Sequence, residues 1–458
     1  MDNTDRLGTE HIGKLLLEFS IPAIVGMLVS ACYNVIDRAF IGHSAGALGI
    51  AAVTIAFPVM TIQMALAGLI GMGATSSISI KLGQGDKATA QKISGNAFTL
   101  LAIVTVLFTA FGLIFLEPML RVFGASSDVL PYAKEYMSVI LLGTVFQSYS
   151  FGMNNMMRAE GKPVIAMMTM LIGSALNIVL APVFIFVFNW GMTGAALATV
   201  CSQAVSAIWI FIHFVTGNGL LRIRLKNLRL EPAIIKQIVM LGLPLFFVQA
   251  AMCIQAAVMN NSLLLYGGDI AISALGIVNS ITTLIVMPIF GINQGSQPII
   301  GYNYGAHHFD RVKKTFMRAM IAATVVSTSG FILTRLIPGQ LIAIFNSSDE
   351  KLIAVGTHAI LTYLVCFVFV GFQIAGSNYF QAVGKPGYAM FLSLSRQVLI
   401  LIPLLLILPR FFKMEGVLIA GPISDFSSFI ITLVCILYEF RRIGKEERQC
   451  VMPLNEAQ

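Results

Sequence analysis

Twelve long apolar runs dominate this sequence. Each holds about 20 or more predominantly apolar residues, the length that an α-helix needs to cross a hydrocarbon core. The runs cover residues 15–40, 49–74, 92–115, 132–155, 164–187, 193–215, 236–263, 270–296, 314–337, 352–380, 388–409 and 416–440. Only 11% of the 458 residues are charged, whereas soluble domains carry about 25%. We therefore expect an all-α integral membrane protein with twelve transmembrane helices.

The basic residues follow the order of the runs. Most of the 29 Lys and Arg residues lie near the two termini or in the loops that follow every second run, as Lys81, Arg222 and Arg442 do. Positively charged loops stay on the cytoplasmic side of a membrane. We therefore expect a multi-pass protein with both termini in the cytoplasm. This topology accounts for the net charge of +8 without a nucleic-acid partner.

The two halves of the chain repeat each other at a spacing of 222 residues. The matched pairs are Pro22 with Pro244, Gly73 with Gly295, Gly83 with Gly305, and Gly194 with Gly416; with one inserted residue, "RAEGKP" at 158–163 also matches "QAVGKP" at 381–386. Internal repeats are a common plan of secondary transporters. We expect two pseudo-symmetric six-helix lobes, at 1–216 and 236–441, with a central cleft between them. The basic segment 217–235 is expected to be a cytoplasmic linker, and 442–458 a cytoplasmic tail.

An acidic residue, Asp37, lies within the first run, in the stretch "ACYNVIDRAFIG". Ionisable groups inside membranes are costly and usually functional. Ser30, Tyr33 and Asn34 lie at helical spacing from Asp37, so this helix face is polar and aromatic. Such a face favours a water-filled cavity over lipid.

Several motifs resemble the multidrug and toxic compound extrusion (MATE) family. They are "YNVIDRAFIG" in the first run, "KLGQGDKATAQK" after the second, "RAEGKP" after the fourth, "LNIVLAPVFIF" in the fifth, "GAALATVCSQ" in the sixth and "GYNYGAHHFDRVKK" after the eighth. The second loop lacks the Asp-Arg/Lys pattern usual in major facilitator proteins. The chain is most similar to the bacterial MepA-like and DinF-like branch.

This resemblance implies a V-shaped pair of lobes in the bacterial inner membrane. It also implies export of amphipathic, often cationic drugs in exchange for inward-moving protons or sodium. The motif positions that match the coupling-ion site are Asp37, Asn177 and Thr199, and helix depth places all three in the outer half of the first lobe. The family pattern usually has a second acid four residues after Asn177, where this chain has Ala181.

The single acid favours protons as the coupling ion, with sodium second. Burial disfavours the charged form of a carboxyl group, so Asp37 can bind a proton outside and release it inside after rehydration. Sodium needs several oxygen ligands, and Ala181 removes one carboxylate; weakened coupling is an equally fair interpretation. The residues expected to line the substrate cavity are Ser30, Tyr33, Asn34, Asn154, Met170 and Ser174.

Two further features concern the helices themselves. Pro22 either bends the first helix or starts its regular part, because proline removes one helical hydrogen bond. Arg396 and Asp425 lie at similar depths in the eleventh and twelfth runs. We expect them to form a buried ion pair whose role is mainly structural.

Other classes of protein remain as alternatives. A lipid-linked precursor flippase of the related fold is the second interpretation, although the runs hold few of the cations that a pyrophosphate group requires. A channel would need a filter-like repeat, and a membrane enzyme would need clustered catalytic groups. We expect no enzymatic activity, no cofactor beyond the coupling ion, no metal site, and a monomer in lipid whose partners are small-molecule drugs.

Overall fold

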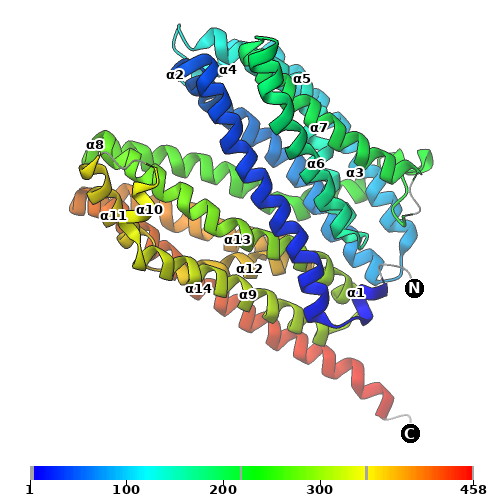
Figure 1. The fold of residues 1–458 in the computed structure, drawn as a ribbon. Coiled ribbons are helices and arrows are strands. Elements are labelled where there is room, and N and C mark those ends of the chain that lie inside the picture. Colours follow the sequence, from blue (N-terminus) through cyan, green and yellow to red (C-terminus); the bar gives the residue numbers. More distant parts are fainter. Residues whose placement is uncertain (1–4, 217–218, 346–348, 456–458) are drawn as a thin grey trace. The chain divides into compact units, whose positions relative to one another are not determined.

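The computed structural model describes residues 5–216, 219–345 and 349–455, and the secondary structure of this part of the chain is helical throughout (Figure 1). The chain divides into two compact units. Unit 1 comprises Met1–Leu7 and Ile21–Gln249, and unit 2 comprises Gly8–Ser20 and Ala250–Gln458. Each unit therefore contains the beginning of a long helix whose remainder belongs to the other unit.

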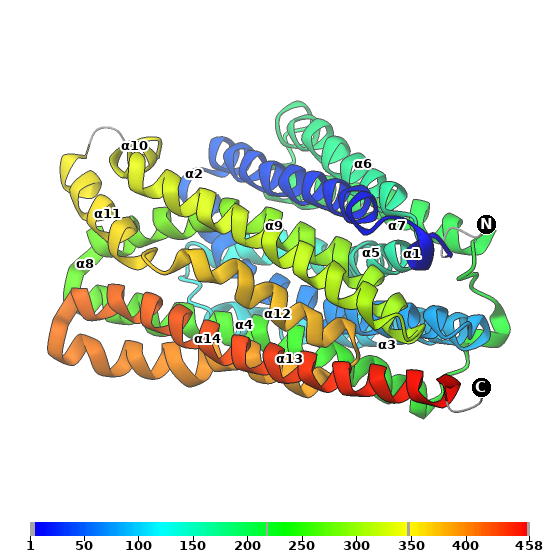
Figure 2. The ribbon, with the colours of Figure 1, turned by 90° about the horizontal axis from the view of Figure 1, so that it is seen from below.

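The helices of unit 1 come largely from the first half of the chain. They are α1 (Asp5–Thr9), α2 (Ile12–Gly83), α3 (Lys87–Ile114), α4 (Leu116–Val122), α5 (Leu130–Ala159), α6 (Pro163–Pro182), the π-helical Val183–Val187, α7 (Gly191–Thr216) and the short 3-10 turn Leu225–Leu228. Helices α5, α6 and α7 pack against one another and lie side by side in both ribbon views (Figure 2).

Unit 2 repeats this arrangement with more interruptions. Its elements are α8 (Pro232–Gly305), α9 (Phe309–Leu336), α10 (Pro338–Ala343), α11 (Glu350–Tyr363), the 3-10 turn Phe367–Phe369, α12 (Val370–Ala382), α13 (Pro386–Leu394), the π-helical Ser395–Leu401 and α14 (Ile402–Asn455). The helix expected at 352–380 is thus a pair, α11 and α12, bent by 52°.

Matching glycines break the longest helix of each half. Gly46 in α2 has φ 59°, and Gly268 in α8 has φ 66°. Positive φ is readily adopted only by glycine, so both positions mark turns between two antiparallel spans. The two glycines are 222 residues apart, which agrees with the repeat seen in the sequence.

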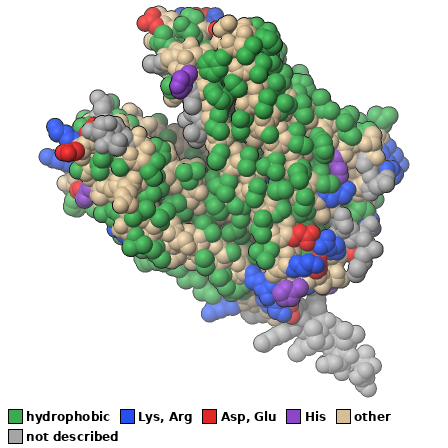
Figure 3. Space-filling view, in the orientation of Figure 1, with side chains coloured by type: hydrophobic (Ala, Val, Ile, Leu, Met, Phe, Trp, Pro, Cys, Tyr) green, Lys and Arg blue, Asp and Glu red, His purple; other side chains and the backbone are tan. Residues whose placement is uncertain are grey.

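The described residues supply the expected twelve spans. Nine helical stretches are long and apolar enough to cross a membrane, and the bent pair α11 and α12 is a tenth. One of the nine, Pro386–Arg442, contains two helices because Lys413 interrupts it with φ 52°. The remaining span is α5, which has 30 residues but a more polar sequence than the others. On the face in Figure 3, hydrophobic side chains cover the sides of the helices, and charged ones gather near their ends.

Close helix packing in unit 1 depends on a glycine in α8. A Cβ atom on Gly242 would lie 1.8 Å from the carbonyl oxygen of Leu69 in α2. No side chain fits in that space, so the first part of α8 packs directly against the main chain of α2. This contact explains why residues up to Gln249 belong to unit 1.

The start of α2 corrects one reading of Pro22. The helix begins at Ile12, so Pro22 lies well inside it and does not start it. The backbone keeps helical torsion angles at Pro22, and the non-helical position in α2 is Gly46. At the other end of the chain, α14 continues to Asn455, and residues 456–458 of the expected tail lie outside the described residues.

Candidate functional site

Two of the three residues expected at the coupling site contact each other in unit 1. The side-chain amide of Asn177 in α6 donates a hydrogen bond to the hydroxyl oxygen of Thr199 in α7, over 3.2 Å. The Thr199 hydroxyl in turn donates to the carbonyl oxygen of Ala195. Both side chains are buried. The structure thus brings together two residues that the sequence placed only at a common depth.

Asp37 lies on the part of α2 that runs along α6. A Cβ on Gly26 would lie 2.9 Å from the sulfur of Met170, and the rings of Phe40 and Phe186 meet edge to face at 6.2 Å. These two contacts bracket Asp37 and place it level with the last turns of α6, which carry Asn177. The Asp37 side chain is 9% exposed. Its carboxyl group is therefore buried in unit 1, on the stretch of α2 that lies along the C-terminal half of α6.

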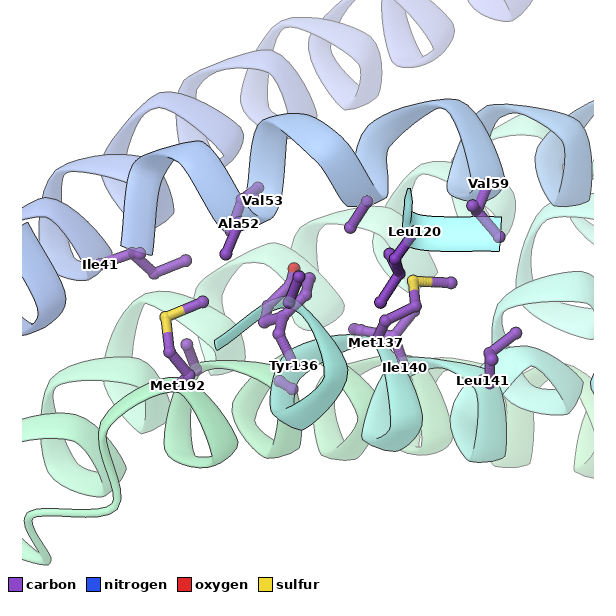
Figure 4. Close-up of a cluster of buried hydrophobic side chains, with 14 of the residues drawn as sticks. Ile41, Ala52, Val53, Val59, Leu120, Tyr136, Met137, Ile140, Leu141 and Met192 are labelled. Atoms are coloured by element: carbon purple, nitrogen blue, oxygen red, sulfur yellow. The ribbon is translucent and has the colours of Figure 1, made fainter. Parts of the chain in front are cut away.

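An apolar cluster lies next to this site along the helices, and Figure 4 shows part of it, including Ile41, Tyr136 and Met192. It contains Ile41 from α2, Ala181 from α6, and Ala195 from α7. Each of these residues lies one helical turn from Asp37, Asn177 or Thr199, in the direction of the C-terminal end of α6. Ala181, where the family pattern has an acid, is fully buried. The Asp37 region is therefore adjacent to a closed apolar surface.

The residues expected to line the substrate cavity do not share one environment. Ser30, Tyr33 and Met170 are half-buried, whereas Ser174 is buried. Asn154 lies between helices instead: its amide donates to the Ala166 carbonyl and to the Thr169 hydroxyl, each at 2.7 Å. The side chain of Asn34 lies outside the described residues.

The ion pair expected in the second half is present in unit 2. The Nε atom of Arg396 donates to Oδ1 of Asp425 over 2.7 Å. Ser424, next to Asp425 on α14, donates to the Arg396 carbonyl oxygen at 2.6 Å. Arg396 lies in the π-helical turn Ser395–Leu401. In this wider turn, the Arg396 carbonyl group accepts the hydrogen bond from Ser424.

A buried carboxylate that the sequence did not single out lies at the C-terminal end of α5. Glu160 accepts hydrogen bonds from the Leu221 amide at 3.1 Å and pairs with His213 at 2.9 Å and Lys162 at 3.4 Å. Burial alone would raise the pKa of Glu160, but the His213 hydrogen bond, the Lys162 charge and the Leu221 amide together hold it below its usual value. Glu160 thereby fastens the segment after α7 to unit 1.

The sequence reading also missed several buried polar residues below the Asn177–Thr199 pair. They are Arg158, Thr169, Ser202 and Ser206, all less than 5% exposed. Their signal was the recurrence of small hydroxyl residues at positions 199, 202 and 206, which is the spacing of one helix face. In an apolar helix, such a row predicts a polar contact with a neighbour.

Comparisons with known proteins agree with this architecture. A family model described as MatE matches residues 22–183 and 244–407. The two matched segments start 222 residues apart, at the two halves of the repeat. The multidrug export protein MepA of Staphylococcus haemolyticus (strain JCSC1435) is 27% identical over 424 residues, covering 92% of this chain and 93% of the relative. MepA of Staphylococcus aureus (strain N315) is 27% identical over 431 residues, with 93% and 94% covered.

Solved structures match over nearly the whole chain. A structure of the MATE multidrug transporter DinF-BH in complex with R6G has 40% sequence identity and a TM-score of 0.90, covering 96% of this chain and 98% of that one. An outward-facing conformation of a multidrug resistance MATE family transporter of the MOP superfamily has 27% identity and a TM-score of 0.91, with 97% and 98% covered.

Proposed function

Because this chain belongs to the MatE family, we propose that it is a secondary active multidrug exporter. We further propose that it exchanges amphipathic organic cations for protons by alternating access, with sodium as the second choice of coupling ion. The similarity to multidrug export proteins over more than nine-tenths of the chain supports the export of drugs. The match to a transporter solved with R6G supports an organic, aromatic substrate.

The buried position of Asp37, on the stretch of α2 that lies along α6, is the observation that supports this proposal most. A carboxyl group inside the helix bundle is stable mainly when it is neutral or holds a cation. Binding of a proton therefore changes the local charge from negative to neutral. A transporter can use that change to favour one conformation when the ion is bound and another when it has left.

The oxygen atoms around the site favour protons over sodium. The Asn177–Thr199 hydrogen bond uses the amide nitrogen, so these two side chains offer one amide oxygen and one hydroxyl oxygen but no carboxylate. The position that would supply a second carboxylate is Ala181, which is fully buried in an apolar cluster. Hard cations such as sodium prefer several oxygen ligands, whereas a proton needs only one carboxylate.

We also propose the cellular setting of this activity. The alternation of basic loops favours the bacterial inner membrane with both termini in the cytoplasm. The proposed cavity residues Ser30, Tyr33, Met170 and Ser174 lie on α2, which carries Asp37, and on α6, which packs along it. A drug bound along this surface would be affected by the charge of that carboxyl group.

Transport by purified protein in lipid vesicles tests the proposal. Export of a fluorescent organic cation should respond to an imposed pH gradient, and Asp37→Asn should abolish this response. Asp128→Asn, which changes an exposed acid in the loop before α5, is the matched control and should transport normally. Transport that follows a sodium gradient and ignores the pH gradient would reject protons as the coupling ion. Full activity in Asp37→Asn would reject the site.

A further inference from the structure

A continuous buried row of hydroxyl groups runs along α7 in unit 1. Thr199, Ser202 and Ser206 are three or four residues apart and therefore share one face. They are between 3% and 5% exposed. Each hydroxyl donates its hydrogen to a main-chain carbonyl, namely that of Ala195, Ala198 or Thr169. The hydroxyl oxygens consequently face their surroundings as hydrogen-bond acceptors.

Helices α6 and α5 continue this row toward the cytoplasmic end of the unit. Ser206 bonds to the carbonyl of Thr169, and the Thr169 hydroxyl accepts a hydrogen bond from Asn154. From Asn177 to Thr169 is eight residues of helix, a rise of about 12 Å. We call the six residues Thr199, Asn177, Ser202, Ser206, Thr169 and Asn154 the polar seam. The seam connects the coupling site with the inner end of α5.

A buried arginine lies at the inner end of the seam. Arg158 is one turn beyond Asn154 on the same face of α5, and it is 2% exposed. Its terminal nitrogens contact only the Asn155 side-chain oxygen at 2.8 Å and the Met170 sulfur at 3.7 Å, and its Nε atom has no hydrogen-bond partner. Among the described residues, no carboxylate lies within ion-pair distance of it. Its positive charge is therefore balanced there by no carboxylate and only by the partial negative charge at the C-terminal end of α5.

The other half of the chain shows that the fold does not need this charge. By the repeat, "RAEGKP" matches "QAVGKP", so Arg158 corresponds to Gln381. Both loops contain a glycine with positive φ, Gly161 at 82° and Gly384 at 77°, followed by a proline at the start of the next helix. The loops thus have the same conformation with and without the arginine. A buried charge that the architecture can omit requires another explanation.

We propose that the polar seam is the route by which the coupling cation leaves for the cytoplasm, and that Arg158 is the electrostatic barrier that prevents leakage along it. This inference rests on the cation coupling proposed above. Acceptor oxygens in a row attract a cation or a hydrated proton. A fixed positive charge at the end of the row opposes its passage, as basic residues do in other membrane pores.

Beyond Arg158, the route ends at an imidazole–carboxylate pair. His213 and Glu160 form a pair at 2.9 Å, with 11% and 2% of their side chains exposed. His213 follows Ser206 by seven residues, two helical turns along α7. The geometry therefore leads from the buried Asp37 region to a titratable pair at the cytoplasmic end of the same three helices.

Passive proton flux into vesicles without any drug tests the proposal. Purified protein is placed in vesicles that contain a pH-sensitive dye, and a proton gradient is imposed. Arg158→Gln should raise the leak at least about tenfold, because a unit charge even about 12 Å from the ion, in a medium of dielectric constant about 20, changes a rate by that factor, and a closer approach changes it more. Arg158→Lys should leak as the wild type does. Arg121→Gln, which changes an exposed arginine in α4, is the matched control.

A second variant tests the route itself. Adding Ser206→Ala to Arg158→Gln removes a seam oxygen and should suppress the extra leak. Retained binding of a fluorescent organic cation shows that each variant is folded. The proposal is wrong if folded Arg158→Gln leaks no more than the wild type, or if Arg158→Lys leaks as much as Arg158→Gln. It is also wrong if adding Ser206→Ala does not reduce the leak of Arg158→Gln. If wild-type drug export ignores both ion gradients, the proposed function fails, while the drug-free leak still measures the barrier.

Discussion

Removing the Glu160 side chain should free the segment after α7 from unit 1. Leu221 is 1% exposed, and its amide donates to Glu160 at 3.1 Å. A Cβ on Gly219 would lie 1.9 Å from a Glu160 carboxylate oxygen, so the chain lies directly against the carboxylate. In Glu160→Ala, the Leu221 amide loses this acceptor. The segment should then open more often.

The size of the effect follows from the contact that opening breaks. A hydrogen bond to a charged group contributes about 1.5–3 kcal/mol net. The contacts of Glu160 with His213 and Lys162 do not involve the segment that contains Leu221. They therefore stay intact when that segment opens and do not contribute to the free energy of opening. Since each 1.4 kcal/mol is about a factor of ten, the open population should increase about ten- to hundredfold.

Hydrogen exchange of the peptide that contains Leu221, measured by mass spectrometry, reports this population directly. Protection should fall ten- to hundredfold in Glu160→Ala. The matched control is Glu231→Ala, which removes an exposed pair with Lys92 whose side chains are 43% and 46% exposed. Such pairs contribute less than about 1 kcal/mol. Equal protection of the Leu221 amide in both variants would refute the reasoning.

Three further outcomes are expected. Asp425→Asn should lower the melting temperature of the purified protein, because breaking a buried ion pair costs about 3–5 kcal/mol. The double variant Arg396→Met with Asp425→Leu should melt close to the wild type, because replacing both partners of a buried pair by apolar residues is often neutral. Gly242→Ala should reduce stability through its clash with α2, whereas Gly276→Ala, which has open space around it, should be neutral or stabilise by up to about 1 kcal/mol; similar melting curves would contradict this. Because the pKa of Glu160 is held below its usual value, its stabilisation is complete above the unfolded pKa and is lost as the pH falls through the folded one. Protection of the following segment, corrected for intrinsic exchange, should therefore persist at mildly acidic pH and fall only in stronger acid.

The sequence predicted the spans and the repeat because both depend on local composition. An apolar run of sufficient length is helical in lipid whatever its neighbours are. Glycines and prolines that recur in order mark the same turns in both halves, as Gly161 and Gly384 do. The depth of Asn177 and Thr199 followed from the helical rise alone, and their hydrogen bond agrees with it.

The rotation of each helix about its own axis could not be predicted in this way. Lipid-facing and core-facing positions are both apolar in a membrane protein, so the sequence lacks the polar face that orients a helix in water. Asn154 was therefore assigned to a drug cavity, although it bonds to α6. Arg158 was considered only as part of the motif "RAEGKP", because its burial depends on packing between α5 and α6.

Each unit contains the start of one helix whose remainder belongs to the other unit, and this affects how the units form during translation. Residues 8–20 leave the ribosome early, yet the unit to which they belong is completed only when α14 has been synthesised. Unit 1 likewise stays incomplete until translation has passed Gln249. Neither unit is therefore a contiguous product of synthesis, and the membrane must hold the early helices loosely until their distant partners are inserted.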